Sequence, residues 1–435
     1  MDSVSCFSPG LRRNVHVLSI FGLEPSDVSI PASPELDNLL VDPVTWSDEA
    51  RIHGLLGWLR EHDPVRRLEP EGYEPFYAIT RHADVMEIER DKAGFVNDPR
   101  PTLAPVMVTE AIQALTGRRH LVRSLVQMDD PDHMKYRMLT AAFFTRQRLA
   151  EMKGEVERLA RETVDRMAEF GGACDFVKDV AVWYPLRVVM SVLGVPPEDE
   201  PYMLKLTQEL FGSTDPDVQR SFDIMAIGDV VKDFEAYFTG ISEDRRANPR
   251  EDLATVIANA TIDGEPIPEL EAAGYYIIVA TAGHDTTSSS TSGGLLALLE
   301  NPAEFAKLRS DPEKYVEGAV EEMIRWVSPV RHFMRTATKD HELRGTTIRE
   351  GESVILWYPS ANRDEDVFDA PFEFRIERPP ARNLAFGYGA HVCLGQHLAR
   401  LEMAALYREL LARVDAIELA GEPQFAQAAF VGGLK

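Results

Sequence analysis

The spacing of apolar residues predicts a chain that is mainly α-helical, above all after residue 146. Four segments repeat apolar positions on one helix face or are apolar almost throughout: Asp48 to His62, Leu149 to Phe170, Val180 to Leu193 and Leu394 to Val414. Gly171 and Gly194 follow two of these segments and are expected to end them. Residues 196–247 predict two more helices, joined by a loop near Gly212 to Pro216.

One long helix is expected from Pro268 to Glu300, with proline at the first helical position. At the helical rise per residue it would be roughly 50 Å long. The seven hydroxyl residues from Thr286 to Ser292, followed by Gly293 and Gly294, have the composition of a flexible linker. Because apolar runs lie directly on both sides, we favour a helix over a linker.

Strands are predicted by alternation at Tyr73 to Thr80 and at Ser353 to Tyr358. Residues 97–126 are rich in proline and are expected to form loops, and residues 360–392 a long ordered meander. Residues 1–45 predict an irregular N-terminal segment. No internal repeat and no convincing linker divides the chain, so we expect one domain over residues 1–435, mainly α with small β-sheet regions.

Composition and charge exclude several classes of function. The net charge is −25, which disfavours binding to nucleic-acid phosphates or to anionic lipid. The three cysteines, Cys6, Cys174 and Cys393, have the spacing of neither a disulfide framework nor a zinc site. No apolar run is long enough to span a bilayer, and Val15 to Leu23 lacks the cleavage site of a signal peptide. We therefore expect a cytoplasmic protein with no nucleic-acid or membrane partner.

The richest local pattern is Phe386-Gly387-Tyr388-Gly389-Ala390-His391-Val392-Cys393-Leu394-Gly395. Two glycines let the backbone turn sharply before Cys393, which stands just ahead of a predicted helix. The positive end of a helix stabilises a thiolate, and a thiolate is an electron-rich ligand for haem iron. An inert buried cysteine is the commoner fate of this residue type, but it does not require these neighbours. A nucleophilic cysteine is a third reading that no other feature supports.

Two weaker patterns accompany the cysteine. In Ala282-Gly283-His284-Asp285-Thr286, the glycine costs about 1 kcal/mol of helix stability relative to alanine. Thr286 can bond back to the carbonyl of Ala282, and the resulting kink has room for a diatomic ligand. Asp285 and Thr286 then supply a carboxylate and a hydroxyl for proton delivery, although a solvated polar turn is the simpler reading.

Glu322 and Arg325 form the second of these weaker patterns. They lie three residues apart on the helical stretch Glu317 to Trp326 and can pair on one face. Such pairs are common on protein surfaces and contribute little there, so the signal is weak by itself.

In this order, the three patterns resemble the cytochrome P-450 family over nearly the whole chain. The resemblance implies haem b as cofactor and O₂ as co-substrate, with the haem between the long central helix and the helix after Cys393. It implies that Cys393 is the iron ligand and that Arg378 joins Glu322 and Arg325 in a buried ion pair. The remaining positions that match haem-binding residues of the family are His133, Arg137, Arg335, His391, Phe386 and Gly387.

Shorter stretches, among them Thr281 to Ser290 and Phe430 to Gly433, resemble bacterial members that hydroxylate terpineol. This likeness implies a small apolar substrate, such as a monoterpenoid or an alkylbenzene. The expected pocket residues are Ile278, Thr281, Ala282, Val330, Phe333, Phe430 and Val431, with Leu121, Val122 and Leu125 as weaker candidates. Because most are apolar, shape would dominate recognition, and Thr281 would be the polar anchor.

The implied activity is insertion of one oxygen atom from O₂ into a C–H bond. The sequence has no glycine fingerprint for a flavin or a dinucleotide, so electrons are expected from an iron-sulfur ferredoxin with its NAD(P)H-dependent reductase. The ferredoxin would dock on the cysteine side, near Arg137 and Arg400. A peroxide-driven haem-thiolate enzyme and a non-enzymatic haem sensor are the alternatives, and neither needs Asp285 and Thr286. A haem-free cysteine hydrolase would be colourless.

Two features depart from the family pattern. Asn383 stands where many bacterial relatives have histidine, which affects the expected support of the haem loop. The chain also stops at Lys435, before the last strand that the family pattern predicts, so we expect a truncated sequence.

Overall fold

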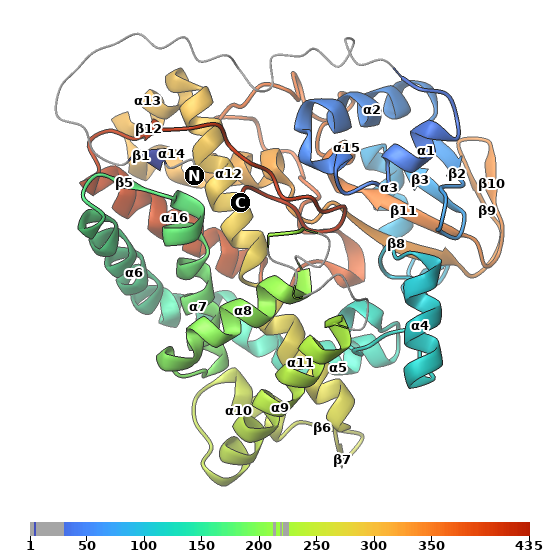
Figure 1. Ribbon diagram of the computed structural model, residues 1–435, viewed down its shortest axis with the longest axis horizontal. Helices are drawn as coiled ribbons and strands as arrows, with labels where there is room; N and C mark the ends of the chain where they lie inside the picture. Colours follow the sequence, from blue (N-terminus) through green and yellow to red (C-terminus); the bar gives the residue numbers. More distant parts are fainter. Residues whose placement is uncertain (1–3, 6–29, 212–214, 218–219, 221–225) are drawn as a thin grey trace.

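The computed structural model describes residues 4–5, 30–211, 215–217, 220 and 226–435 (Figure 1). Cys6, the apolar stretch Val15 to Leu23 and part of the predicted loop at Gly212 to Pro216 lie outside these residues. Most of the described chain is helical, and the largest sheet lies beside α1, α2 and α3 at one end of the molecule. No helix in the described ranges has the length and apolar character needed to cross a membrane.

The helices are α1 (Glu35–Leu39), α2 (Glu49–His62), α3 (His82–Arg90), α4 (Val106–Thr116), α5 (Asp132–Thr140), α6 (Arg146–Glu169), α7 (Trp183–Leu193), α8 (Glu200–Phe211), α9 (Ala226–Ala247), α10 (Leu253–Ala258), α11 (Glu269–Ala282), α12 (Asp285–Glu300), α13 (Pro302–Ser310), α14 (Pro312–Val327), α15 (Tyr358–Ala361) and α16 (Gln396–Arg413). The strands are β1 (Val4–Ser5), β2 (Val65–Leu68), β3 (Phe76–Ile79), β4 (Phe95–Val96), β5 (Ala173–Cys174), β6 (Thr261–Ile262), β7 (Glu265–Pro266), β8 (His332–Ala337), β9 (His341–Leu343), β10 (Thr346–Ile348), β11 (Ser353–Trp357) and β12 (Glu418–Leu419).

The largest sheet has the strand order β2-β3-β11-β8-β4. Its middle strand, β11, runs parallel to β3, with Ile355 opposite Ala78, and antiparallel to β8, with Ile355 opposite Met334. Every residue of β11 is buried, which suits a short apolar run covered on both faces. Because β8 is a strand of this sheet and α3 lies beside it, side chains from both can reach the interior next to the sheet.

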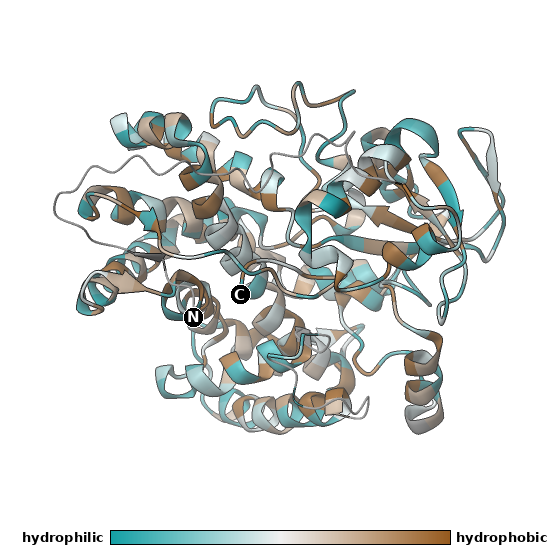
Figure 2. Cartoon of the chain, turned by 45° about the horizontal axis from the view of Figure 1, so that its top comes forward, coloured by the Kyte–Doolittle hydropathy of each residue, from teal (hydrophilic) through white to brown (hydrophobic). Residues whose placement is uncertain are grey.

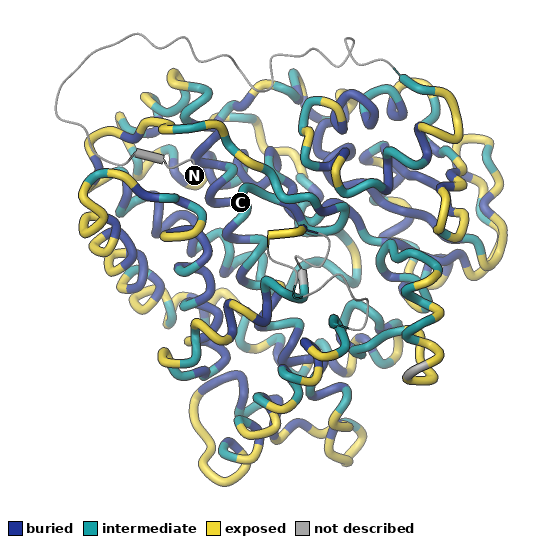
Figure 3. Tube along the Cα trace, in the orientation of Figure 1, coloured by how far each residue is buried: buried dark blue, intermediate teal, exposed yellow. Residues whose placement is uncertain are grey.

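The helical part is built around α12, which packs against α7, α14 and α16. A Cβ added to Gly293 would lie 2.7 Å from Cγ2 of Val327, and one added to Gly294 would lie 2.6 Å from Cγ of Met323. The two glycines therefore allow α14 to approach α12 closely. The choice of helix over linker is confirmed, because α12 is continuous through the hydroxyl run. Figure 3 shows buried stretches in the central helices and in the largest sheet, and Figure 2 shows hydrophobic residues in both.

Most predicted elements are confirmed, with boundary shifts of a few residues. α2, α6 and α16 match three of the apolar segments, α8 and α9 match the helix pair, and 360–392 is a meander with only short helical turns. The helix predicted from Val180 begins only at Trp183, because a π-helical turn, Phe176–Ala181, precedes it.

Two predictions are wrong. The loop-rich segment 97–126 contains α4, which starts after Pro105 and ends at Gly117 with a φ of 68°. The prolines before α4 obscured its apolar spacing. The N-terminal segment is not irregular throughout, because α1 lies within it and buries Leu36.

Candidate active site

The central helix predicted from Pro268 to Glu300 is broken in the middle. α11 ends at Ala282 and α12 begins at Asp285, so Gly283 and His284 lie in the break. The Thr286 hydroxyl donates a hydrogen bond of 2.9 Å to the carbonyl oxygen of Ala282, as expected. A Cβ on Gly283 would lie 2.9 Å from Cγ2 of Val189 on α7, so a side chain there would displace the neighbouring helix. The predicted kink is confirmed, and the single long helix is corrected to two.

A cavity of about 270 Å³ lies between this break and the loop that carries Cys393. Ala282, Gly283 and Thr286 line one side. Phe386, Gly387 and residues 391–395 line the other, with Leu398 of α16 behind them. The cavity thus lies between the central helices and the helix after the cysteine, where the resemblance implies the haem.

The Cys393 loop is held by its own backbone. The Cys393 N–H donates to the carbonyl oxygen of Phe386 at 2.9 Å, and Gly387 and Gly389 have φ values of 67° and 70°. A Cβ on Gly389 would also collide with the carbonyl oxygen of Glu89. These positions therefore require glycine.

Burial raises the pKa of the Cys393 thiol, while the N–H groups of Gly395 and Gln396 and the charges of Arg137 and Arg400 lower it. The helix end alone therefore does not make a thiolate here. A bound metal cation does so, because a coordinating thiol loses its proton. No group of three histidine, cysteine or acidic side chains in the described ranges is placed to hold a metal ion. A cysteine thiolate is one of the ligands that hold haem iron in proteins.

One end of the cavity is polar, and several buried atoms there have no hydrogen-bond partner among the described residues. His133 stacks on His391 with ring centroids 3.8 Å apart, and Arg335 lines the same end. Both ring nitrogens of His133, Oδ1 of Asn97 and Oε2 of Glu89 are buried without a hydrogen-bond partner among the described residues. Buried polar atoms normally have partners, so this cluster indicates a polar ligand. The His133 ring and the Arg335 cation suit the two carboxylates of haem, whereas the oxygens of Asn97 and Glu89 are acceptors and need a proton donor.

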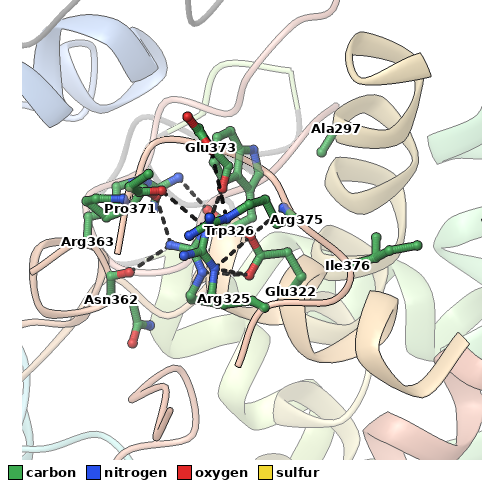
Figure 4. A network of polar contacts seen from close by, with 12 residues as sticks. Ala297, Glu322, Arg325, Trp326, Asn362, Arg363, Pro371, Glu373, Arg375 and Ile376 are labelled. Atoms are coloured by element: carbon green, nitrogen blue, oxygen red, sulfur yellow. Dashed lines mark hydrogen bonds and ion pairs between the residues drawn. The ribbon is translucent and has the colours of Figure 1, made fainter. Parts of the chain in front are cut away.

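In a second polar network, the carboxylate of Glu322 has partners for both of its oxygens (Figure 4). Arg325 donates to both carboxylate oxygens of Glu322 at 2.8 Å, and Arg378 donates to them at 3.1 and 3.0 Å. Arg325 also donates to the carbonyl oxygens of Asn362 and Pro371. The network ties α14 to the meander that leads to the Cys393 loop, and the predicted three-residue ion pair lies together here.

The cavity contains some of the predicted substrate residues. Ile278, Ala282, Val330, Phe333 and the weaker candidate Leu125 line it. Thr281 does not: it is 1% exposed and donates to the carbonyl oxygen of Ile277, so the predicted polar anchor is corrected.

The other predicted pocket residues lie outside the lining. Phe430 packs behind Phe333 with ring centroids 5.6 Å apart, and Val431 bridges to Val330 and lines a different cavity. Leu121 and Val122 pack against the hydrophobic core.

Sequence reasoning missed several lining residues: Glu89, Asn97, Phe144, Val189, Tyr275, Val279, Thr287 and Ser290. Helical spacing could have found Val279 and Ser290, which lie three or four residues from Ala282 and Thr286 on one face. No local signal marks Glu89 or Asn97.

The hydroxyl run divides between two cavities. Thr286, Thr287 and Ser290 line the Cys393 cavity, whereas Asp285, Ser288, Ser289 and Ser292 line a larger one of about 630 Å³. Oδ1 of Asp285 lies 3.1 Å from Nδ1 of His284, and burial raises the pKa of Asp285. The acid and the alcohol that were expected to act together therefore line different cavities.

Three residues near the loop have defined partners. Asn383 accepts from the Ala385 N–H and donates to Glu321, each at 3.2 Å, and so supports the loop where histidine was expected. Arg400 bonds to Glu321 and lies over the Phe386 ring, and Arg137 donates to the carbonyl oxygen of Val392 at 2.6 Å. Both arginines are thus engaged within the protein.

Known proteins resemble the chain along most of its length. A model of the family described as Cytochrome P450 matches residues 107–417. Cytochrome P450-terp of Pseudomonas sp is 42% identical over 403 residues, which cover 90% of this chain and 94% of that protein. Methyl-branched lipid omega-hydroxylase of Mycobacterium tuberculosis is 33% identical over 423 residues, with coverage of 95% and 96%.

Two solved structures are similar as well. CYP108D1 from Novosphingobium aromaticivorans has a TM-score of 0.86 and 45% identity, and the match covers 93% of this chain and 98% of that one. Mycobacterium marinum cytochrome P450 CYP268A2, in complex with pseudoionone, has a TM-score of 0.85 and 30% identity, with coverage of 94% and 99%. The mainly α fold with small sheets is confirmed. Because the matched region includes both the broken helix and the cysteine loop, the chain belongs to the cytochrome P450 family of haem-dependent monooxygenases, which use O₂ as co-substrate.

Proposed function

We propose that the enzyme oxidises a C–H bond of a small apolar substrate, a monoterpenoid or an alkyl-aromatic compound, with electrons from a ferredoxin and its NAD(P)H-dependent reductase. The observation that carries this proposal is the apolar wall that faces Cys393, formed by Ile278, Val279, Val330 and Phe333. Such a wall selects by shape and offers few polar anchors. The likeness to terpineol-hydroxylating members and the 42% identity to cytochrome P450-terp support the same substrate class.

The chain's residues would divide the work around the haem, which supplies the oxidising chemistry when bound. Cys393 would hold the iron, and Arg137, Arg335, His133 and His391 would hold the haem carboxylates. The Thr286 hydroxyl donates to the carbonyl oxygen of Ala282, so its lone pairs would accept a hydrogen bond from a proton-carrying group in the cavity. Asp285, with its raised pKa, would hold a proton on the far side of α12 and deliver it by a change of rotamer.

The substrate class is tested by titrating the visible spectrum of the purified protein with monoterpenoids, alkylbenzenes and, as a matched control, their carboxylated analogues. We expect the apolar compounds to shift the Soret band from the low-spin to the high-spin form and to give hydroxylated product with a ferredoxin system. A shift with the carboxylates alone would overturn the substrate class. If the purified protein shows no haem band at all, the proposed haem-dependent activity is wrong.

The proton-delivery role is tested with Asp285→Asn. General acid–base groups contribute on the order of 100-fold or more, so turnover should fall by at least about tenfold and its solvent isotope dependence should change. Ser289→Ala, which alters the same larger cavity without an acid, should leave turnover within about twofold of wild type. Unchanged turnover in Asp285→Asn would remove Asp285 from the mechanism.

One observation favours the peroxide-driven alternative, namely that the Asp285 carboxylate does not line the Cys393 cavity. Product formation with hydrogen peroxide alone distinguishes the two. We expect it to be slower than with reductase, ferredoxin and O₂. A faster peroxide reaction, with an Asp285→Asn variant as active as wild type, would favour the alternative.

A further inference from the structure

Glu89 is a buried acid that neither the sequence patterns nor the roles described above assign. It lies on α3, and its side chain is 1% exposed. Oε1 accepts a hydrogen bond from the Tyr358 hydroxyl at 2.8 Å and lies 3.3 Å from Nη2 of Arg335. Oε2 accepts no hydrogen bond of good geometry in the described part of the chain, although the Tyr388 N–H lies near enough to lower the pKa of the carboxyl. One carboxylate oxygen is therefore satisfied and the other is not.

The unsatisfied oxygen belongs to the polar end of the Cys393 cavity. Glu89 lines that cavity and also a smaller pocket beside it, together with Asn97, His133, Arg335 and His391. Gly387 leaves space next to the carboxyl, since a Cβ there would lie 3.4 Å from Oε1. The side chains of Asn97 and His133 in the same space also carry unpartnered atoms. A ligand that satisfies these groups also meets Glu89.

We propose that Glu89 is a further haem-binding residue, whose carboxylic acid donates a hydrogen bond from Oε2 to one carboxylate of the haem. Two carboxyl groups that share a site cannot both ionise without strong repulsion, so they retain a proton between them. Arg335 then balances the remaining negative charge. The proposal depends on the haem of the family and is independent of the substrate.

Burial, rather than the charges around it, brings the pKa of Glu89 toward neutral pH. Burial raises the pKa of Glu89 to about 7, against the opposing effects of Arg335, Tyr358 and the Tyr388 N–H. Burial also lowers the pKa values of His133 and His391 and raises that of Tyr358 well above its ordinary value. The remaining charged groups that face it, across the smaller pocket, are Lys92, Asp129 and Asp130.

This assignment couples the proton on Glu89 to the electron on the haem. Reduction adds one negative charge beside the carboxyl pair, so a protonated Glu89 favours it and an ionised Glu89 opposes it. The electron comes from the ferredoxin, and the proton comes from solvent and binds at Glu89. We therefore expect the reduction potential to fall, and haem release to speed up, as pH rises through neutrality.

The test uses the holoenzyme, with spectroelectrochemical titration and haem transfer to apomyoglobin measured on both sides of the Glu89 pKa of about 7. Glu89→Gln keeps the shape and a donor but cannot ionise. We expect the potential of wild type to decline with pH and its haem release to accelerate several-fold, whereas both are flat in Glu89→Gln. Glu87→Gln is the matched control, because Glu87 lies on the same helix and pairs with His341 at the surface. It should behave as wild type.

A second variant keeps the proposal testable if Glu89→Gln folds poorly. Tyr358→Phe removes the hydroxyl that donates to Oε1, so the ionised form of Glu89 is less stable and the midpoint of the pH dependence moves to higher pH. An unchanged midpoint in Tyr358→Phe, or a pH slope that survives in Glu89→Gln, would assign the titration to another group and overturn the proposal.

Discussion

Glu322 and Glu89 are two equally buried carboxylates with opposite surroundings. They are 3% and 5% exposed. Both oxygens of Glu322 accept bonds, from Arg325, from Arg378 and from the backbone N–H of Arg375, and these bring its pKa below the ordinary value although burial raises it. At Glu89 burial prevails and the pKa rises to about 7. Burial alone therefore does not distinguish a structural carboxylate from one that binds a ligand. The number of hydrogen-bond partners around each carboxylate does distinguish them.

The comparison separates a charge that holds the fold from charges that await a ligand. The Glu322 network joins α14 to the meander and has no need of the cofactor. The cluster at Glu89, His133 and Asn97 leaves buried atoms without hydrogen-bond partners among the residues described, and these atoms face the cavity. We expect variants of the first to lose stability and variants of the second to lose haem.

The largest expected effect is at Arg325. Arg325→Met leaves the Glu322 charge buried with fewer partners, and the free energy of unfolding should fall by about 3–5 kcal/mol. Urea unfolding measures this. The control is Arg158→Met, which removes exposed pairs with Glu155 and Glu162 and should cost under about 1 kcal/mol. Equal losses in the two variants would mean that the Glu322 network is no stronger than a surface pair.

The next largest effect is expected in how the free energy of unfolding depends on pH, through the ionisation of Glu89. Its pKa is higher in the folded chain than the ordinary 4.5, so its contribution to stability is present below that value and is lost as pH rises through about 7. A shift of this size corresponds to about 3 kcal/mol at most. Between mildly acidic and alkaline pH, wild type should therefore lose stability relative to Glu89→Gln. If the difference in stability between wild type and Glu89→Gln is the same at both pH values, Glu89 does not have the raised pKa on which the comparison with Glu322 depends.

A smaller effect is expected at His133, whose ring nitrogens have no hydrogen-bond partner in the described residues and whose ring stacks on His391. His133→Phe preserves the stacking and removes the nitrogen atoms, so haem release should be roughly tenfold faster, equivalent to about 1.4 kcal/mol. Amide exchange in the core of α6 should not change. Loss of protection in α6 together with haem release would make His133 a structural residue instead.

The parts of the site that could be predicted are those whose causes are local. The Thr286–Ala282 bond spans four residues, and the cysteine loop closes within eight, so both are visible in the sequence. The Glu89 cluster is not, because Tyr358 and Arg335 are 269 and 246 residues away in the chain. Only the fold brings α3 and β8 to the same cavity.

Thr281 was predicted to be the polar anchor of the substrate pocket, and its position on the helix explains why it does not line that cavity. It lies in α11, before the break at Gly283 and His284, and its hydroxyl donates back to the carbonyl oxygen of Ile277. Asp285 and Thr287 lie about 100° to either side of Thr286, and only Thr287 shares the cavity that Thr286 lines. Residue type indicated a shared role for these side chains, whereas helical geometry separates them.

The division of the hydroxyl run has a practical meaning for redesign. Residues 286, 287 and 290 line the Cys393 cavity, whereas residues 288, 289 and 292 line the larger cavity of about 630 Å³. Within this run, a mutant library aimed at new substrates should therefore vary Thr287 and Ser290 and leave Thr286 in place. A spectroscopic probe attached at Ser289, which lines the larger cavity, would leave the lining of the Cys393 cavity unchanged.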